Sequence, residues 1–130
     1  MRRQMSEFCI YTIVHGKELN KRTRTKKFTF HENKRWVTGH ALWREANKAH
    51  ATMPVLFGDA VNVERLLYWG VLTDIRVDGN TTSFTVDRLH RIQDRTRQGL
   101  ILRSTRKPIA RAFIRPYAIC RTPAWLREAA

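Results

Sequence analysis

The sequence predicts an α+β fold, a small mixed, mostly antiparallel β-barrel with one central and one C-terminal helix. Three observations predict it. Apolar and polar residues alternate over several short segments, as they do in half-buried antiparallel strands. One segment in the middle of the chain has helical periodicity instead. The hydrophobic fraction of 42% and the length of 130 residues suit a single folded domain, residues 1–130.

The first half of the chain supplies a strand, a basic loop and the central helix. Phe8 to Val14 is aromatic and β-branched, which predicts a first strand. The polar and basic stretch near 15–27 predicts a mobile loop, and the alternation at 28–30 predicts a short strand. From about Gly39 to His50, apolar residues recur on one helical face, with Thr38 as the expected N-cap.

The second half contains the strongest local signal, a β-hairpin. A short buried strand is expected at 54–57. The hairpin follows over 66–92, because both arms alternate and Asp78-Gly79-Asn80 between them accepts positive φ at low cost. Further strands are expected within 100–120, and a short helix over 124–129 after a cap and a helix-starting proline.

The charge of the chain is large and arranged in blocks. There are 25 Lys and Arg against 11 Asp and Glu, which gives a formal net charge of +14. One basic block lies between His15 and Trp36, and a second, in which Arg strongly outnumbers Lys, lies between Arg88 and Arg115. Because such charge repels itself in a compact fold, it indicates a polyanionic partner, and nucleic acid is the leading candidate.

Aromatic residues add a second feature of nucleic-acid binding, since rings can hold an unpaired base while cations bind phosphate. Trp36 has polar neighbours and Tyr68 faces away from the apolar side of its strand, so ligand contact and core packing are both open interpretations for these two residues. Trp125 is expected to dock the last helix onto the sheet. The candidate nucleic-acid-binding residues are Lys21, Arg22, Arg24, Lys26, Lys27, Trp36, Trp43, Tyr68, Arg88, Arg91, Arg115 and Tyr117.

The sequence offers little for catalysis. Asp59 is the best isolated carboxylate; near His40 or His90 it would form an acid/base pair, although a capping or turn aspartate is the favoured interpretation. Lys17 is a further weak candidate. The histidines and cysteines lack metal-ligand spacing and no cofactor motif occurs, so neither a metal nor a cofactor is expected. An enzyme acting on nucleic acid, such as a nuclease or nucleobase hydrolase, and a basic interaction domain of a ribonucleoprotein remain the alternatives to a binding module.

Location and redox state follow from the apolar segments. No apolar run approaches the ~20 residues that span a bilayer, and no secretory signal is recognised. Cys9 and Cys120 lie in apolar runs, which predicts buried free thiols. A cytoplasmic protein without a membrane partner is expected. RNA and DNA are equally compatible with this composition, and any oligomeric state is compatible with it too.

Two motifs follow each other in the central stretch: Met53 to Ala60 carries a strand that ends in Gly-Asp, and Leu66 to Ile75 carries a Gly before apolar alternation. In this order and pattern the stretch resembles the PUA-like superfamily. The EVE, YTH and ASCH branches share this small barrel. The resemblance implies binding of RNA or DNA, often with a modified or extruded base between aromatic side chains. By position, Trp36, Trp43 and Tyr68 are the residues that would line such a pocket.

One part of the chain departs from a branch of that superfamily. ASCH-type members typically show an early Gly-x-Lys-x-x-Glu-x-Arg pattern. Here Gly16-Lys17-Glu18 is followed by Lys21-Arg22, so the residue types are present in a different register. The departure argues against hydrolase activity and leaves the implied binding role unaffected.

Overall fold

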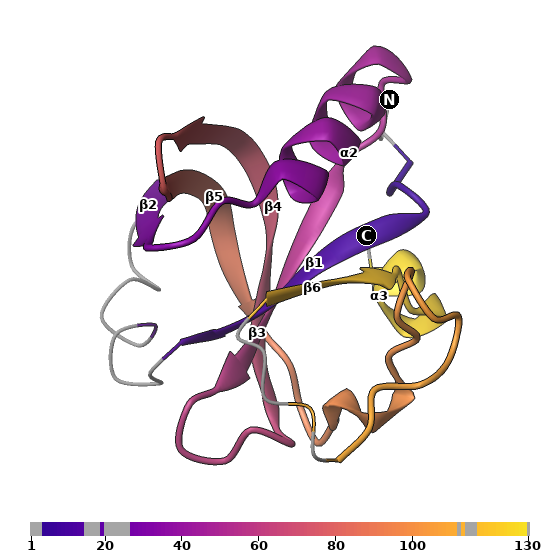
Figure 1. Cartoon of the computed structure of the whole chain (residues 1–130). Helices are drawn as coiled ribbons and strands as arrows, with labels where there is room; N and C mark the ends of the chain where they lie inside the picture. Colours follow the sequence, from indigo (N-terminus) through magenta and orange to yellow (C-terminus); the bar gives the residue numbers. More distant parts are fainter. Residues whose placement is uncertain (1–3, 15–18, 20–26, 112, 114–116, 130) are drawn as a thin grey trace.

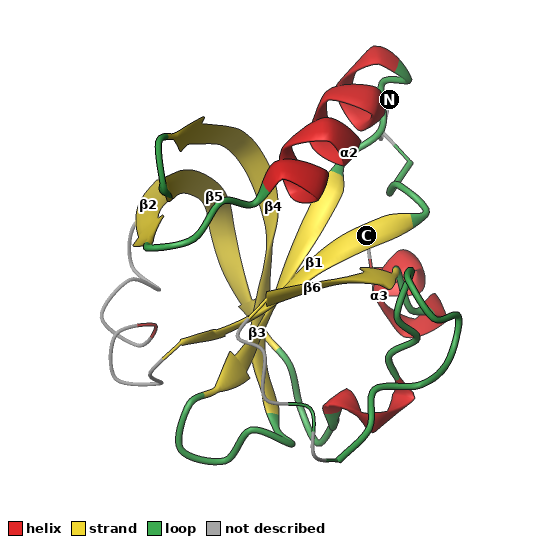
Figure 2. Cartoon of the chain, viewed as in Figure 1, coloured by secondary structure: helices red, strands yellow, loops and turns green. Residues whose placement is uncertain are grey.

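The computed structural model describes residues 4–14, 19, 27–111, 113 and 117–129 (Figure 1). Its strands form one mixed sheet in the order β2-β5-β4-β3-β1-β6. The strands are β1 (Phe8–Val14), β2 (Lys27–Glu32), β3 (Met53–Asp59), β4 (Leu66–Asp78), β5 (Thr81–Arg91) and β6 (Tyr117–Arg121). The helical elements are α2 (Val37–Lys48), α3 (Ala124–Ala129) and the 3-10 turn η1 (Arg97–Gly99), as Figure 2 shows.

The α+β class, the mostly antiparallel sheet and the two helices are confirmed. Only β1 and β3 pair in parallel; the other four neighbouring pairs are antiparallel. The sheet order begins at β2 and ends at β6, and no pairing between these two described strands closes it. Strand pairing therefore gives an open, curved sheet and does not establish a barrel.

The start of α2 differs from the expectation. Thr38 lies inside the helix, so its predicted role as the N-cap is wrong; Trp36 occupies that position without a side-chain cap. Side chains from distant strands instead accept hydrogen bonds from backbone N–H groups at the start of α2. The Trp36 N–H donates to Thr82 Oγ1 at 2.9 Å, and the Gly39 N–H donates to Tyr117 Oη at 2.9 Å. Tertiary acceptors thus replace a local cap, because the helix N-terminus is held against β5 and β6.

Two core clusters lie on the two faces of the sheet. Alternation in β1 sends Ile10 to one cluster and Cys9 and Tyr11 to the other. The first cluster includes Ala46 of α2, so α2 covers that face. The second includes Leu100, Ile109 and Leu126, so the segment after β5 and α3 cover the opposite face. Both cysteines are buried and free, as expected.

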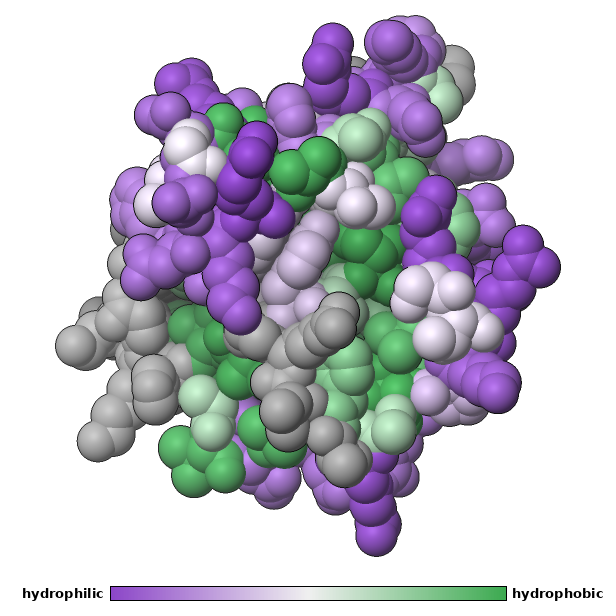
Figure 3. All heavy atoms as spheres, viewed as in Figure 1, coloured by the Kyte–Doolittle hydropathy of each residue, from purple (hydrophilic) through white to green (hydrophobic). Residues whose placement is uncertain are grey.

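In Figure 3, hydrophilic residues lie over α2 and along the rim of the molecule, whereas hydrophobic atoms appear in the centre of the viewed face.

Leu19 is the one described residue of the basic stretch near 15–27 before Lys27, and it is fully buried in the first cluster. The predicted mobility of that stretch otherwise falls outside the described residues.

A bulge brings β4 and β5 unusually close at Gly70. The pairing shifts between Trp69 and Val71, so β5 has one extra residue there. A Cβ at Gly70 would lie 2.2 Å from Val86 Cγ1 and 3.0 Å from the Arg88 carbonyl oxygen. Arg88 itself has φ +47°. Only a residue without a side chain fits this approach, which explains the glycine in the alternating strand.

Candidate nucleic-acid interface

The structure places the predicted aromatic residues in or against the first core cluster. Trp36 is 1% exposed, and its ring lies 4.6 Å from Phe84 and 4.4 Å from Tyr117, stacked between them. The expectation that Trp36 is exposed or in contact with a ligand is therefore wrong. Its neighbours Lys34 and Arg35 are exposed, but the backbone turns into α2 at this residue and directs the ring inward.

The other predicted rings are half-buried against the same cluster. The Trp43 indole Nε1–H donates to the Leu72 carbonyl at 3.2 Å, and Tyr68 packs against the cluster from β4. Burial raises the pKa of Tyr117, whose hydroxyl accepts the Gly39 N–H. Trp43 and Tyr117 hold α2 on the sheet, and all three rings pack against the core cluster that contains Trp36.

The predicted basic contacts are only partly described. Lys27, Arg88 and Arg91 are exposed along β2 and β5. Lys27 of β2 pairs with Asp87 of β5, and Arg91 of β5 pairs with Tyr68 of β4. The remaining predicted cations lie outside the described residues: Lys17, Lys21, Arg22, Arg24, Lys26 and Arg115.

Asp59 has a structural partner. Its Oδ1 accepts the Val61 N–H at 2.9 Å, the geometry of a turn aspartate. Asp59 lies at the end of β3 that points away from α2, the helix that carries His40 (Figure 1). The structure thus does not bring Asp59 and His40 together as an acid/base pair. Within the described ranges, no three His, Cys, Asp or Glu side chains cluster as a metal site would require.

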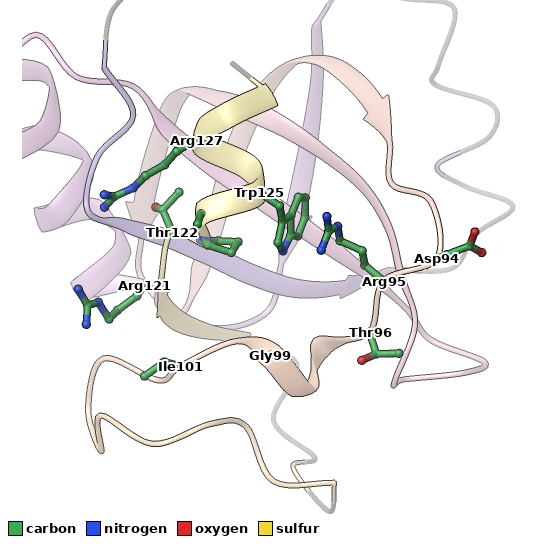
Figure 4. Close-up of a pocket in the computed structure, with 11 residues that line it drawn as sticks. Asp94, Arg95, Thr96, Gly99, Ile101, Arg121, Thr122, Trp125 and Arg127 are labelled. Atoms are coloured by element: carbon green, nitrogen blue, oxygen red, sulfur yellow. The ribbon is translucent and has the colours of Figure 1, made fainter.

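A cleft lined by arginines lies where the segment after β5 meets the junction of β6 and α3 (Figure 4). Its volume is about 660 Å³. Arg95, Arg121 and Arg127 line this arginine cleft, and all three are exposed. Asp94 is the one acidic residue among the described residues that line it. The lining therefore carries a net positive charge.

An aromatic ring pairs with one of these cations. The guanidinium carbon of Arg95 lies 4.6 Å from the centre of the Trp125 ring, within the range of a cation–π contact. Figure 4 shows the two side chains next to each other, with Trp125 projecting from α3. Trp125 also packs against the second core cluster, which confirms that it docks α3 on the sheet. The ring is thus half-buried and held in place, while its cation faces solvent.

Backbone contacts fix both walls of the arginine cleft. Thr122, before α3, donates its Oγ1–H to the Ser6 carbonyl and its N–H to the Glu7 carbonyl, each at 2.8 Å. On the other wall, the carbonyl of Arg95 accepts the Leu66 N–H at 3.1 Å. Trp125 and Arg95 therefore sit on segments that are anchored to the N-terminal segment and to β4.

The cleft arginines are available for a ligand. Within the described part of the chain, ion pairs join Arg76 to Asp74 and Arg111 to Glu64, and none involves Arg95, Arg121 or Arg127. Burial of three neighbouring cations without acidic partners would be costly, but exposed heads on apolar stems are tolerated. An anionic ligand could therefore pair with these three arginines without first breaking an ion pair within the described part of the protein.

Sequence reasoning missed this cleft. Its cations come from the segment after β5, the end of β6 and α3, which no local pattern places together. The available signal was compositional, because arginine outnumbers lysine throughout the second basic block and Trp125 follows it. The sequence pointed to Arg88 and Arg91 in that block, whereas Arg95, Arg121 and Arg127 are the arginines that line the cleft.

Two general findings complete the description of the site. Among the described helices, none has the length and apolar character needed to cross a bilayer. Comparison with protein-family models, with curated proteins and with solved structures found no match to this chain, so the case for its function rests on the geometry above.

Proposed function

We propose that the protein is a nucleic-acid-binding module and that the arginine cleft is its contact surface. The observation that carries the proposal is Arg95 over the Trp125 ring in a cleft whose other cations are Arg121 and Arg127. A guanidinium matches the geometry of a phosphate with two parallel hydrogen bonds. A base can stack on the guanidinium that covers the indole, or displace it and stack on the ring itself.

The combination of ring and cations favours nucleic acid over an acidic protein. Carboxylates of a protein partner would be met by the arginines alone and would leave Trp125 without a role in binding. A nucleotide uses both, because it carries a phosphate and a flat base on one unit. The net charge of +14 acts in the same direction, since it attracts the ligand from a distance.

The relationship to the PUA-like superfamily is part of the proposal. It is supported by the mixed sheet, by Gly58-Asp59 at the end of β3 and by Gly70 of β4 opposite the bulge of β5. Under this proposal the curved sheet corresponds to the small barrel of that superfamily.

Two free, buried thiols agree with a reducing compartment, so a cytoplasmic location is proposed as well.

The test is a binding titration by fluorescence anisotropy with labelled RNA and DNA oligonucleotides over a salt series. Arg95→Gln and Arg127→Gln are expected to weaken binding and to reduce the slope of log K against log salt by about 1 for each phosphate that the variant no longer binds. Trp125→Leu keeps an apolar side chain but removes the ring, and it should weaken the free energy of binding by about 1–3 kcal/mol.

Arg76→Gln is the matched control. Arg76 is an exposed arginine of β4 that is paired with Asp74 and does not line the cleft. This variant therefore removes one positive charge at a site outside the cleft. Its affinity should stay within about twofold of the unchanged protein, because a distant charge contributes only screened attraction. Equal losses in Arg76→Gln and Arg95→Gln would refute the assignment of the cleft, and cleaved oligonucleotide in the same samples would favour an enzyme instead.

A further inference from the structure

A second pocket adjoins the arginine cleft and repeats its composition. This pocket, which we call the Phe8 pocket, has a volume of about 610 Å³ and is lined by Phe8, Arg103 and Arg106. Arg121 and Ile101 line both sites. In Figure 4 these two residues lie at the end of the arginine cleft away from Arg95, so the Phe8 pocket continues from that end.

Each site contains an arginine over an aromatic ring. In the Phe8 pocket, the guanidinium carbon of Arg103 lies 5.2 Å from the centre of the Phe8 ring. In the arginine cleft, Arg95 lies 4.6 Å from Trp125. Arg121 belongs to both linings, so one shared cation stands between two ring-and-cation pairs.

Strand pairing holds the Phe8 pocket in place. Phe8 of β1 faces Arg121 of β6 in the antiparallel register. On the other side of β6, the Arg103 N–H donates to the Ile119 carbonyl and the Arg121 N–H donates to the Ile101 carbonyl, both at 2.9 Å. The ring, the shared cation and Arg103 therefore come from three neighbouring backbone segments joined by hydrogen bonds.

Single, exposed aromatic rings are common on protein surfaces, but this arrangement is specific in its order. Base-binding proteins place rings and cations along one line, because bases and phosphates alternate along a strand. Across the two sites, Arg121 stands between the rings of Trp125 and Phe8. This spatial order matches a base, a phosphate and a second base along a strand. The one acidic residue of the Phe8 pocket among those described, Glu7, is opposed there by three arginines, Arg103, Arg106 and Arg121.

We propose that the ligand is an unpaired strand that occupies both sites, with one base at Trp125, a second base at Phe8 and the intervening backbone phosphate on Arg121. This inference rests on the proposed function and names its substrate class. A duplex keeps its bases stacked and paired inside the helix, so it cannot present two of them to separate rings. An unpaired strand can, whether it is RNA or DNA.

The first experiment is photocrosslinking. A 12-nucleotide single strand that contains 5-iodouracil is irradiated with the protein, and adducts are located by mass spectrometry. The proposal expects adducts at both Trp125 and Phe8. Adducts at Trp125 alone would overturn the second base site while leaving the proposed function intact. Adducts at neither residue would overturn both.

Affinities measured at about 150 mM salt test the same point. Phe8→Leu removes the ring and should weaken binding of the 12-mer about fivefold or more, the loss expected for one stacked base. Phe8→Tyr keeps a ring and should retain the affinity, which separates stacking from a folding defect. Arg121→Gln should weaken binding more than the control Arg76→Gln, because Arg121 serves both sites.

A blunt duplex of the same length and composition is the matched ligand control. It should bind at least about tenfold more weakly than the single strand, since only phosphates remain to be contacted. Equal affinities for duplex and single strand would overturn the proposal. If Trp125→Leu weakens single-strand binding but Phe8→Leu and Phe8→Tyr both match the unchanged protein, only the two-site inference fails.

Discussion

Replacing Gly39 with alanine is expected to destabilise the protein, although the same change stabilises most exposed helices by about 0.8–1 kcal/mol. A Cβ at Gly39 would lie 2.8 Å from Tyr117 Oη and 3.3 Å from Ile10 Cδ1. The tyrosine hydroxyl is not free to move aside. Its ring is stacked on Trp36 with centroids 4.4 Å apart, and the hydroxyl accepts the Gly39 N–H at 2.9 Å.

The magnitudes decide the sign of this effect. Displacing the hydroxyl breaks a hydrogen bond worth about 0.5–1.5 kcal/mol, and shifting the ring weakens a stacking interaction of similar size. Overpacking adds roughly 1–3 kcal/mol where the neighbours cannot relax. Together these effects exceed the gain in helix propensity, so we expect Gly39→Ala to lower the free energy of unfolding by about 1–3 kcal/mol.

A double-mutant cycle makes the prediction sharp. Tyr117→Phe removes the nearest atom, so Gly39→Ala in that background should be neutral or stabilising by up to about 1 kcal/mol. Urea denaturation of the four proteins gives the coupling energy, which should be at least about 1 kcal/mol. An equal cost of Gly39→Ala in both backgrounds would refute the reasoning, because the hydroxyl would then not be the obstacle.

Two further predictions concern stability. Gly70→Ala should cost about 3 kcal/mol or more, because its Cβ would lie 2.2 Å from Val86 Cγ1 and close to backbone that cannot yield; a loss below about 1 kcal/mol in urea denaturation would contradict the close approach of β4 and β5. Burial raises the pKa of two tyrosines and of both cysteines, that of Cys120 to about 12: Tyr11, Tyr117, Cys9 and Cys120. The unfolded chain loses these protons first, so the stability that these four groups contribute should be full below about pH 8 and fall as the pH rises further; thermal melts above about pH 7 check it, and a flat profile there would disprove it.

The hairpin is the part of the fold that the sequence predicts best. Its arms were expected at 66–77 and 81–92, and β4 and β5 end within about one residue of those bounds. Gly79 has φ +58°, as the turn chemistry requires. Hairpins are predictable because alternation and turn residues act locally. The start of α2 was predicted less well, since its acceptors Thr82 and Tyr117 come from distant strands.

The candidate site could not be predicted for a related reason. Trp36 has charged neighbours in sequence, yet its environment is set by Phe84 and Tyr117, which approach only in the folded chain. Arg95 and Trp125 are separated by 29 intervening residues in the sequence and meet at 4.6 Å. Composition showed that arginines are abundant. Only the fold shows which of them line one cleft.

A buried cation lies in the segment that forms one wall of the arginine cleft. Arg97 of η1 is 0% exposed, and its neighbours Thr96 and Gly99 line the cleft. Its guanidinium hydrogen bonds within the described residues all go to neutral oxygens, at 2.8–3.2 Å: Tyr11 Oη and the carbonyls of Arg111 and Phe113. The guanidinium carbon also lies 5.7 Å from the centre of the Phe113 ring. A charge in that setting is screened less than one on the surface. The hydrogen bonds of Arg97 therefore keep a positive charge inside the segment that forms one wall of the cleft where we place the phosphates.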